Sequence, residues 1–285
     1  MPDFSARPPR PPLPPRALPI PGARPDQAQG LRRLFAGRRR VVVPVAANPH
    51  DANGARVLDR LAVMLAAQGR QVLVVDAAGT SPAPHELADV DLSACVVNVA
   101  PRIGYLAARG LPLAYVDPRG SCGAFIDAVQ SAAPQAEVLL LHADGVDLAR
   151  LLKHRAVRPI LLGADHPESI KHAYANAKLL VRRCELMSFD LLLLASLQSP
   201  RAAGIAESLG SCLGTFLGAA LRGTALLDTE AQPDARSNAA LTRLLAAQLA
   251  LDVAPDTPPD EPPRPPDWPQ AMSPAAGFLS RPAFR

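Results

Sequence analysis

The loop between the first expected strand and the first expected helix bears most directly on chemistry. Residues 48–55 read NPHDANGA. In parallel α/β folds this loop meets a helix N-terminus, whose unpaired backbone N–H groups attract anions. A phosphate cradle there also needs several glycines, a lysine for the β- and γ-phosphates and a Ser or Thr for magnesium. This loop has one glycine, Gly54, with no lysine and no hydroxyl, and Asp51 would repel phosphate. The pattern predicts a phosphate-binding frame that has lost its phosphate chemistry.

Other reactive residue types form no constellation in the sequence. The four cysteines are Cys95, Cys122, Cys184 and Cys212. They contain no C-x-x-C pair, so neither a zinc site nor a disulfide framework is expected, which fits a reducing compartment. His166 and His172 are six residues apart and fall on different faces of a helix, which argues against a metal site. Asp190 is expected to be a solvated charge at the flank of a strand. No metal is expected.

Buried-strand and helix patterns alternate along the middle of the chain and supply the frame for this loop. Strands are expected at 41–47, 71–76, 93–99, 113–117, 138–142, 158–162, 189–195 and 223–227. Helices are expected at 55–68, 103–109, 123–131, 146–154, 167–184, 201–217 and 238–251. This alternation predicts a doubly wound α/β fold with a mainly parallel sheet.

Proline and arginine set off the two ends of the chain. Ten of the 32 prolines lie in residues 1–25 and ten more lie between Pro255 and Pro282. We therefore expect a disordered Pro/Arg-rich arm at 1–25, a short helix at 26–36, an α/β domain at 37–252 and a disordered tail at 253–285. The short helix would place Ala28, Leu31, Leu34 and Phe35 on one apolar face.

Charge and hydropathy restrict the partners and the compartment. Residues 1–40 carry nine arginines against two aspartates, whereas the chain as a whole has a net charge of only +4. The basic arm lacks the interleaved aromatic residues of a base-stacking surface, so no specific nucleic-acid binding is expected. There is no apolar signal-peptide core and no run of about 18 apolar residues, so a cytoplasmic protein is expected.

The frame around the loop resembles the MinD/ParA-type deviant Walker ATPases, which share the pattern GKGGVGKT, a helix, and then "NLA..LA..G..VLLLDAD". The matching run here is LAVMLAAQGRQVLVVDAAG. The resemblance places Asn48 at the first glycine of the family loop, Pro49 at its signature lysine, Gly54 (after Asn53) at the P-loop lysine and Ala55 at the magnesium-binding threonine. It also matches Asp76 to a magnesium or switch aspartate, and it puts His142 near the expected Walker B aspartate.

Within that class, three segments resemble FlhG (FleN) proteins, which regulate flagellar number and placement. DQAQGLRR at 26–33 resembles their "DQAxxLR" element, DHPESIKHAYANAK at 165–178 resembles a family helix, and FLGAALRGTALL at 216–227 resembles a family strand. In that family the N-terminal element docks on FlhF, a GTPase of the signal-recognition-particle type, and its glutamine completes the FlhF site. The resemblance assigns partner activation to a short set of residues: Asp26, Gln27, Ala28, Leu31 and Arg32.

The resulting expectation is a cytoplasmic pseudo-ATPase adaptor of flagellar biosynthesis, with no cofactor, that stimulates or docks on an FlhF-like GTPase. Flagellar basal-body proteins or a flagellar transcription activator are alternative partners, and homodimer formation stays open. The family's membrane-targeting helix has no counterpart in the proline-rich 253–285 segment, so weak or no membrane binding is expected. The rival interpretation is an ATPase that binds ATP and magnesium through atypical ligands, with Arg56 in place of lysine and Asp76 near the metal.

Overall fold

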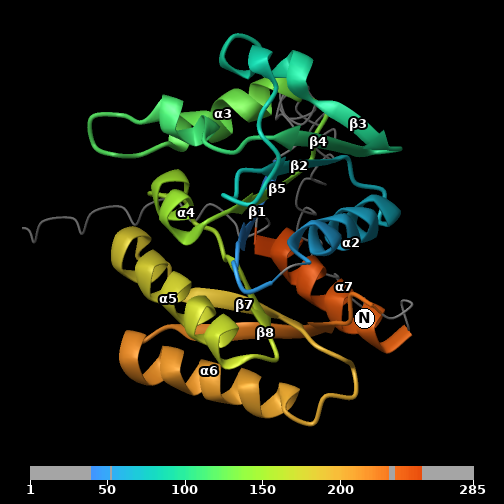
Figure 1. Ribbon diagram of the computed structural model, residues 1–285, viewed down its shortest axis with the longest axis vertical. Helices are drawn as coiled ribbons and strands as arrows, with labels where there is room; N and C mark the ends of the chain where they lie inside the picture. The colour runs from blue at the N-terminus through green and yellow to red at the C-terminus, as the bar shows by residue number, and fades with distance from the viewer. Residues whose placement is uncertain (1–39, 52, 231–234, 252–285) are drawn as a thin grey trace, which may run out of the picture. The chain divides into compact units, whose positions relative to one another are not determined.

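The computed structural model describes residues 40–51, 53–230 and 235–251. In these residues the chain forms an eight-stranded sheet in the order β3-β4-β2-β5-β1-β6-β7-β8, with helices on both faces (Figure 1). The arm at 1–25, the expected helix at 26–36 and the tail at 253–285 lie outside the described residues. The predicted doubly wound, mainly parallel α/β fold is confirmed.

The strands are β1 (Val41–Ala46), β2 (Val72–Asp76), β3 (Val97–Ala100), β4 (Ile103–Ala107), β5 (Val138–Ala143), β6 (Ile160–Ala164), β7 (Ser188–Leu194) and β8 (Ala220–Leu227). The helices are α2 (Gly54–Ala67), α3 (Gly123–Ala132), α4 (Gly145–Leu151), α5 (Pro167–Cys184), α6 (Ala202–Leu217) and α7 (Ala235–Ala250). Short 3₁₀ turns occur at η1 (Glu86–Asp89), η2 (Ser93–Cys95) and η3 (Leu111–Tyr115).

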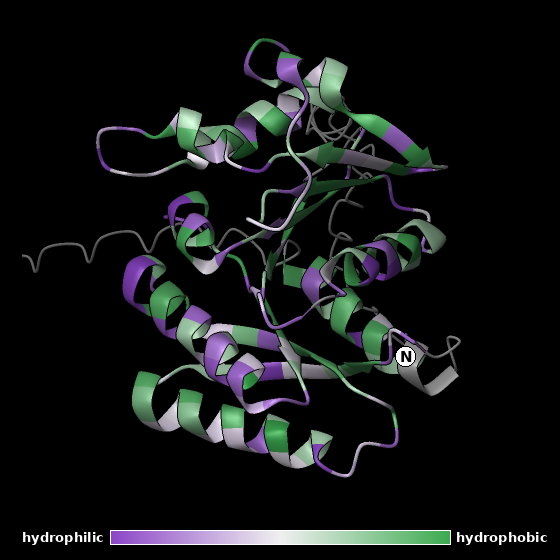
Figure 2. Cartoon of the chain, in the orientation of Figure 1, coloured by the Kyte–Doolittle hydropathy of each residue, from purple (hydrophilic) through white to green (hydrophobic). Residues whose placement is uncertain are grey.

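Each face of the sheet has its own hydrophobic core. On one face α2 and α7 bury Leu61, Leu65 and Leu245 against the strands. On the other face α3, α4, α5 and α6 cover a larger cluster that includes Phe125 and Phe189. The central strands are green on the hydropathy scale of Figure 2, because each is apolar on both sides. Two covered faces are what near-continuous apolar strands require.

Several helix boundaries agree closely with the sequence patterns. The helix expected at 167–184 occupies those residues, with Pro167 in its first turn. The first helix ends before Gly69, whose φ of 83° lies in the left-handed region that glycine tolerates best.

Two expected elements are wrong, and both lie beyond β2. Residues 103–109 were expected to be helical, but 103–107 form strand β4. Ile103 packs in one core and Leu106 in the other, so the strand is covered on both faces and lacks simple alternation. Residues 113–117 were expected to be a strand, but the 3₁₀ turn η3 lies there instead. The strand expected at 93–99 begins only at Val97 and runs antiparallel to β4.

Asp190 corrects a third expectation, because it is buried and not solvated. Only 1% of it is exposed, and its Oδ2 accepts hydrogen bonds from Arg158 Nε at 2.9 Å and from Gln248 Nε2 at 2.8 Å. Burial raises the pKa of Asp190, and these two partners only partly offset it. Gln248 belongs to α7 and also donates to Arg158 O, so this buried cluster fastens α7 to the start of β6 and to β7.

Candidate functional site

The candidate site lies where the strand order reverses around β1. Strand β1 is hydrogen-bonded to β5 on one side and to β6 on the other, and all three run parallel. Ligand sites in open α/β sheets form beside the carboxyl ends of strands at such a switch point. The segment that leaves β1 here leads into α2, the helix that begins at Gly54. The expected loop therefore occupies the position at which this fold builds its sites.

A buried Asp–His pair lies on the sheet beneath the loop between β1 and α2. Asp76 and His142 are register partners at the ends of β2 and β5. His142 Nδ1 lies 2.7 Å from Asp76 Oδ1, and the two residues are 4% and 5% exposed. The carboxylate can only accept while Asp76 is ionised, so Nδ1 carries the shared proton in that state.

Two further side chains satisfy the same carboxylate. Ser81 Oγ donates a hydrogen bond to Asp76 Oδ1, and Tyr105 Oη donates to Oδ2 at 3.2 Å. Burial alone would raise the pKa of Asp76, but the hydrogen bonds from His142, Ser81 and Tyr105 together leave that pKa below its usual value. For Tyr105, burial and then the neighbouring Asp76 raise the pKa of the phenol. Both oxygens of Asp76 are therefore engaged within the chain.

The imidazole of His142 lies behind the first turn of α2. A Cβ placed on Gly54 would stand 3.8 Å from His142 Cε1 and 4.0 Å from Nε2, which is ordinary van der Waals contact. Among the described residues, the hydrogen bonding of His142 runs through Nδ1. The ring thus stands between Asp76 and the helix N-terminus that could receive an anion.

Asn48 anchors the head of the loop. Its side chain is 6% exposed, and Nδ2 donates to Leu162 O at 2.8 Å and to both oxygens of Ser169 at 2.9 Å. Its Oδ1 accepts from the backbone N–H of His50 at 3.1 Å. Asn48 therefore ties the loop to β6 and α5 and does not face outward. Pro49, the next residue, is exposed.

Two more carboxylates lie in the loop itself and just after β5. Asp51 Oδ1 accepts from the N–H of Asn53 at 2.9 Å, and its Oδ2 is buried without a hydrogen-bond partner. Burial raises the pKa of Asp51, although the Asn53 bond and the nearby His142 act against this. Asp144, which precedes α4, accepts from the N–H of Gly79 at 2.9 Å.

The first residues of α2 carry small side chains or side chains that already have partners. The N-cap Asn53 makes no side-chain capping bond, and the following residues Gly54 and Ala55 supply neither an amine nor a hydroxyl. Arg56, the lysine substitute of the rival interpretation, pairs with Glu230 at 2.6 Å on the surface. The oxygens of Asp76, which a metal would need, already have protein partners.

Residues that could hold a metal ion do not gather elsewhere in the described ranges, where no group of three His, Cys, Asp or Glu side chains has suitable geometry. His172 lies near His50 of the loop, with ring centroids 5.9 Å apart and planes at 71°. Burial, and then the proximity of His50, lower the pKa of His172. No helix in the described part of the chain is both long and apolar enough to cross a membrane.

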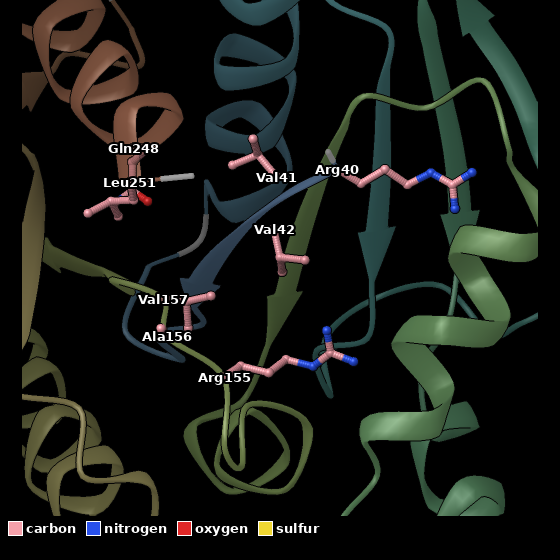
Figure 3. Close-up of a pocket in the computed structure, with 8 residues that line it drawn as sticks. All are labelled: Arg40, Val41, Val42, Arg155, Ala156, Val157, Gln248 and Leu251. Carbon is pink, nitrogen blue, oxygen red and sulfur yellow. The ribbon is translucent and has the colours of Figure 1, made fainter. Parts of the chain in front are cut away.

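A hollow of about 220 Å³ lies at the other end of β1, away from the loop that leads into α2 (Figure 3). Arg40 and Arg155 border it, but their guanidinium groups extend toward α3. Arg40 donates to Gln130 O at 2.6 Å, and Arg155 donates to Asp127 Oδ1 at 2.7 Å. Because both cations already have acceptors, this hollow is a poor anion site.

The structure gives the sequence-predicted residues different places. Asn48 is buried at the head of the loop, Gly54 begins α2 beside His142, and Asp76 pairs with His142 at the end of β2. Pro49 is exposed, Asn53 precedes α2 and Ala55 lies in its first turn. The partner-activating set, Asp26, Gln27, Ala28, Leu31 and Arg32, lies outside the described residues. The roles of Ser81 and Tyr105 were missed, and so was the pairing of His142 with Asp76. The sequence contained one signal for this pairing: one expected buried strand ends in Asp76 and another ends in His142.

Comparison with solved structures supports the fold. The chain of the MinC:MinD cell division protein complex of Aquifex aeolicus matches with a TM-score of 0.52 at 13% identity, over 73% of this chain and 96% of that one. A putative plasmid partition protein of Borrelia burgdorferi, bound to AMPPNP, matches with a TM-score of 0.53 at 10% identity, over 74% and 98%. No protein-family model matches this chain. No curated protein matches it by sequence either.

These likenesses define the class of fold. The protein has the MinD/ParA-type P-loop NTPase fold, with its candidate site at the loop between β1 and α2.

Proposed function

We propose that this protein is an adaptor that uses a MinD/ParA-type fold without ATP. The observation that carries the proposal is the Asp76–His142 contact of 2.7 Å, made below the start of α2. A magnesium-dependent site would need carboxylate oxygens that are free to bind metal or its water. In this chain His142, Ser81 and Tyr105 take those positions around Asp76.

The electrostatics of the loop support the same conclusion. Phosphate groups are held by backbone N–H groups together with lysine or arginine charge. The chain has three lysines, and the first is Lys153, so none occurs in the loop or before it. Asp51 and Asp144 instead bring negative charge to this region. Bound ATP would meet carboxylates without the cation that normally compensates its γ-phosphate.

The partner side of the proposal rests on the resemblance of residues 26–33 to the FlhG element. We infer that this segment docks on an FlhF-like GTPase in the cytoplasm and so acts in flagellar biosynthesis. Gln27 would orient the water that attacks GTP, which is the role that a positioned glutamine plays in other GTPases. Leu31 would supply apolar contact and Arg32 charge complementarity. The alternative partners, a basal-body protein or a flagellar transcription activator, would bind to the same α/β domain.

The test is GTP hydrolysis by the cognate FlhF-like protein, with and without the full chain. We expect the chain to accelerate hydrolysis and Gln27→Ala to abolish most of that acceleration while binding persists. Gln29→Ala is the matched control, because it removes the same side chain two residues away. Unchanged GTP turnover in the presence of the wild-type chain would exclude the activator role. Equal loss in the Gln27→Ala and Gln29→Ala variants would exclude the assignment of Gln27.

A further inference from the structure

The hollow at the other end of β1 lies beside both ends of the described part of the chain. Arg40 and Leu251, the first and the last described residues, both border it. Strand β1, the segment before β6 and the end of α7 surround the hollow (Figure 3). Its aliphatic lining residues are Val41, Val42, Ala156, Val157 and Leu251. Residues 1–39 therefore join the described domain at the rim of a mainly aliphatic hollow.

Leu251 and Gln248 give this hollow two features that call for an occupant. Leu251 is apolar and yet 40% exposed. Gln248 is buried, and its Nε2 donates to Asp190 and to Arg158 O, which makes Oε1 the acceptor of the amide. That oxygen is buried and has no hydrogen-bond partner among the described residues. Because buried acceptors are normally hydrogen-bonded, the hollow combines apolar surface with an acceptor that needs a donor.

The size of the hollow suits one large apolar side chain. An apolar cavity of about 150 Å³ holds benzene, and this hollow measures about 220 Å³. The cations at its rim, Arg40 and Arg155, already have acceptors. An aromatic ring, followed by a backbone N–H for Gln248 Oε1, therefore matches the hollow better than an anion does.

The segment 26–36 carries such a ring close to the hollow in sequence. Its residues Leu31, Leu34 and Phe35 have the i, i+3, i+4 spacing that places side chains on one face of a helix. Gly37 directly follows the expected helix, at the position where glycine commonly lets the chain change direction. Phe35 lies five residues before Arg40, at most about 17 Å away along an extended chain. The ring can therefore reach the rim.

We propose that this hollow is the docking site of the chain's own segment 26–36, with the ring of Phe35 inserted between β1 and the end of α7. The backbone N–H groups that follow Phe35 are the donors for Gln248 Oε1. A helix this short is marginal in water and gains its stability from burial of its apolar face. Because the segment and the hollow belong to one chain, they meet at a millimolar effective concentration.

Docking also hides Gln27, a consequence that rests on the proposed function. Gln27 precedes Leu31 by four residues and so shares its helix face, whereas Arg32 and Arg33 point elsewhere. A segment held in the hollow cannot enter the site of a GTPase. The partner must compete with the hollow for the segment, so docking keeps the chain inactive until the partner is present.

Maleimide labelling of the Ala156→Cys chain measures the docking itself. Ala156 borders the hollow and is exposed in the described structure, so a thiol there reacts quickly unless the segment covers it. Mass spectrometry of the labelled peptide separates this thiol from the native cysteines. We expect Phe35→Asp to speed labelling about tenfold, because burial of one aromatic side chain is worth at least that factor. Phe4→Asp, the matched control in the arm, should leave the rate unchanged.

A change on the hollow side leaves the segment itself intact. Leu251→Lys should also speed labelling, whereas Leu87→Lys, at a leucine of similar exposure on η1, should not. Thermal melting will show that each variant keeps the fold. Equal labelling rates with and without Phe35→Asp would overturn the proposal. So would a rate that Leu251→Lys leaves unchanged, because the segment would then lie elsewhere.

GTP hydrolysis by the cognate FlhF-like protein separates this proposal from the proposed function. Leu251→Lys should lower the chain concentration that gives half-maximal stimulation, because the segment no longer has to leave the hollow. Stimulation that Leu251→Lys does not alter would overturn the masking of Gln27. Protection of the thiol together with a complete lack of stimulation would support the docking site and reject the activator function.

Discussion

Asp76 and His142 stand 66 residues apart in the chain and 2.7 Å apart in the structure, as register partners on β2 and β5. Each residue alone is unremarkable in the sequence. Their contact matters because it lies next to the loop between β1 and α2, the position at which open α/β sheets usually bind ligands. The histidine on β5 thus pairs with the carboxylate at the end of β2, beside the first residue of α2.

Removing the histidine should reveal how much the pair stabilises the fold. His142→Ala would leave buried Asp76 with only Ser81 and Tyr105 as partners. We expect a loss of about 2–3 kcal/mol in the free energy of unfolding, because a buried polar group would lose a partner. Urea denaturation measures it. His166→Ala, at an exposed residue, should change stability by less than about 0.5 kcal/mol. Equal urea midpoints for His142→Ala and His166→Ala would contradict a stabilising role for the Asp76–His142 pair.

The pH dependence of stability should carry the signature of Asp76. Its pKa in the folded chain lies below the ordinary value of 3.8. The ionised form therefore stabilises the fold fully above pH 3.8, and this contribution is lost as the pH falls below 3.8 through the folded pKa. The stability difference between wild type and Asp76→Asn should accordingly shrink in that acidic range. Thermal melts from neutral to acidic pH provide the measurement, and a constant difference would refute the lowered pKa.

Gln248 should matter far more than its position near the end of α7 suggests. Its amide donates to Asp190 Oδ2 and Arg158 O, each at 2.8 Å. Gln248→Ala removes both bonds inside the core, and we expect a loss of about 2–3 kcal/mol. Gln198→Ala, at an exposed glutamine, serves as the control with little effect. Hydrogen exchange should also show faster opening of α7 in the Gln248 variant. Unchanged exchange would mean that the apolar contacts alone hold the helix.

Two glycine-to-alanine substitutions should act in opposite directions. A Cβ at Gly145 would approach Asn176 Oδ1 to a distance that real structures do not allow, and Asn176 donates to Ala47 O at 3.0 Å. Gly145→Ala should therefore lower stability by about 1–3 kcal/mol. Gly204 lies within α6 with open space around it, so Gly204→Ala should raise stability by about 0.5–1 kcal/mol. Destabilisation by both would argue against the described packing.

The alternation of elements could be predicted because it depends on local apolar patterns. The miss at 103–107 shows the limit of such patterns, since Ile103 and Leu106 pack in opposite cores and blur the strand period. Burial of Asp190 could not be foreseen, because its partners lie 32 and 58 residues away. The Asp76–His142 contact likewise requires β5 to lie beside β2, and strand order is a property of the topology and not of either segment.

Isothermal titration of the purified full chain with ATP and magnesium tests the central claim most directly. A MinD/ParA-type ATPase with an intact P-loop provides the positive control under the same conditions. We predict no binding heat for this chain, because Gly54 and Ala55 carry no side-chain amine or hydroxyl for phosphate or magnesium and Asp76 is held by His142. Binding of ATP–magnesium with a Kd of about 1 μM, which corresponds to roughly −8 kcal/mol, would contradict the account and establish the protein as a nucleotide-binding member of its fold class.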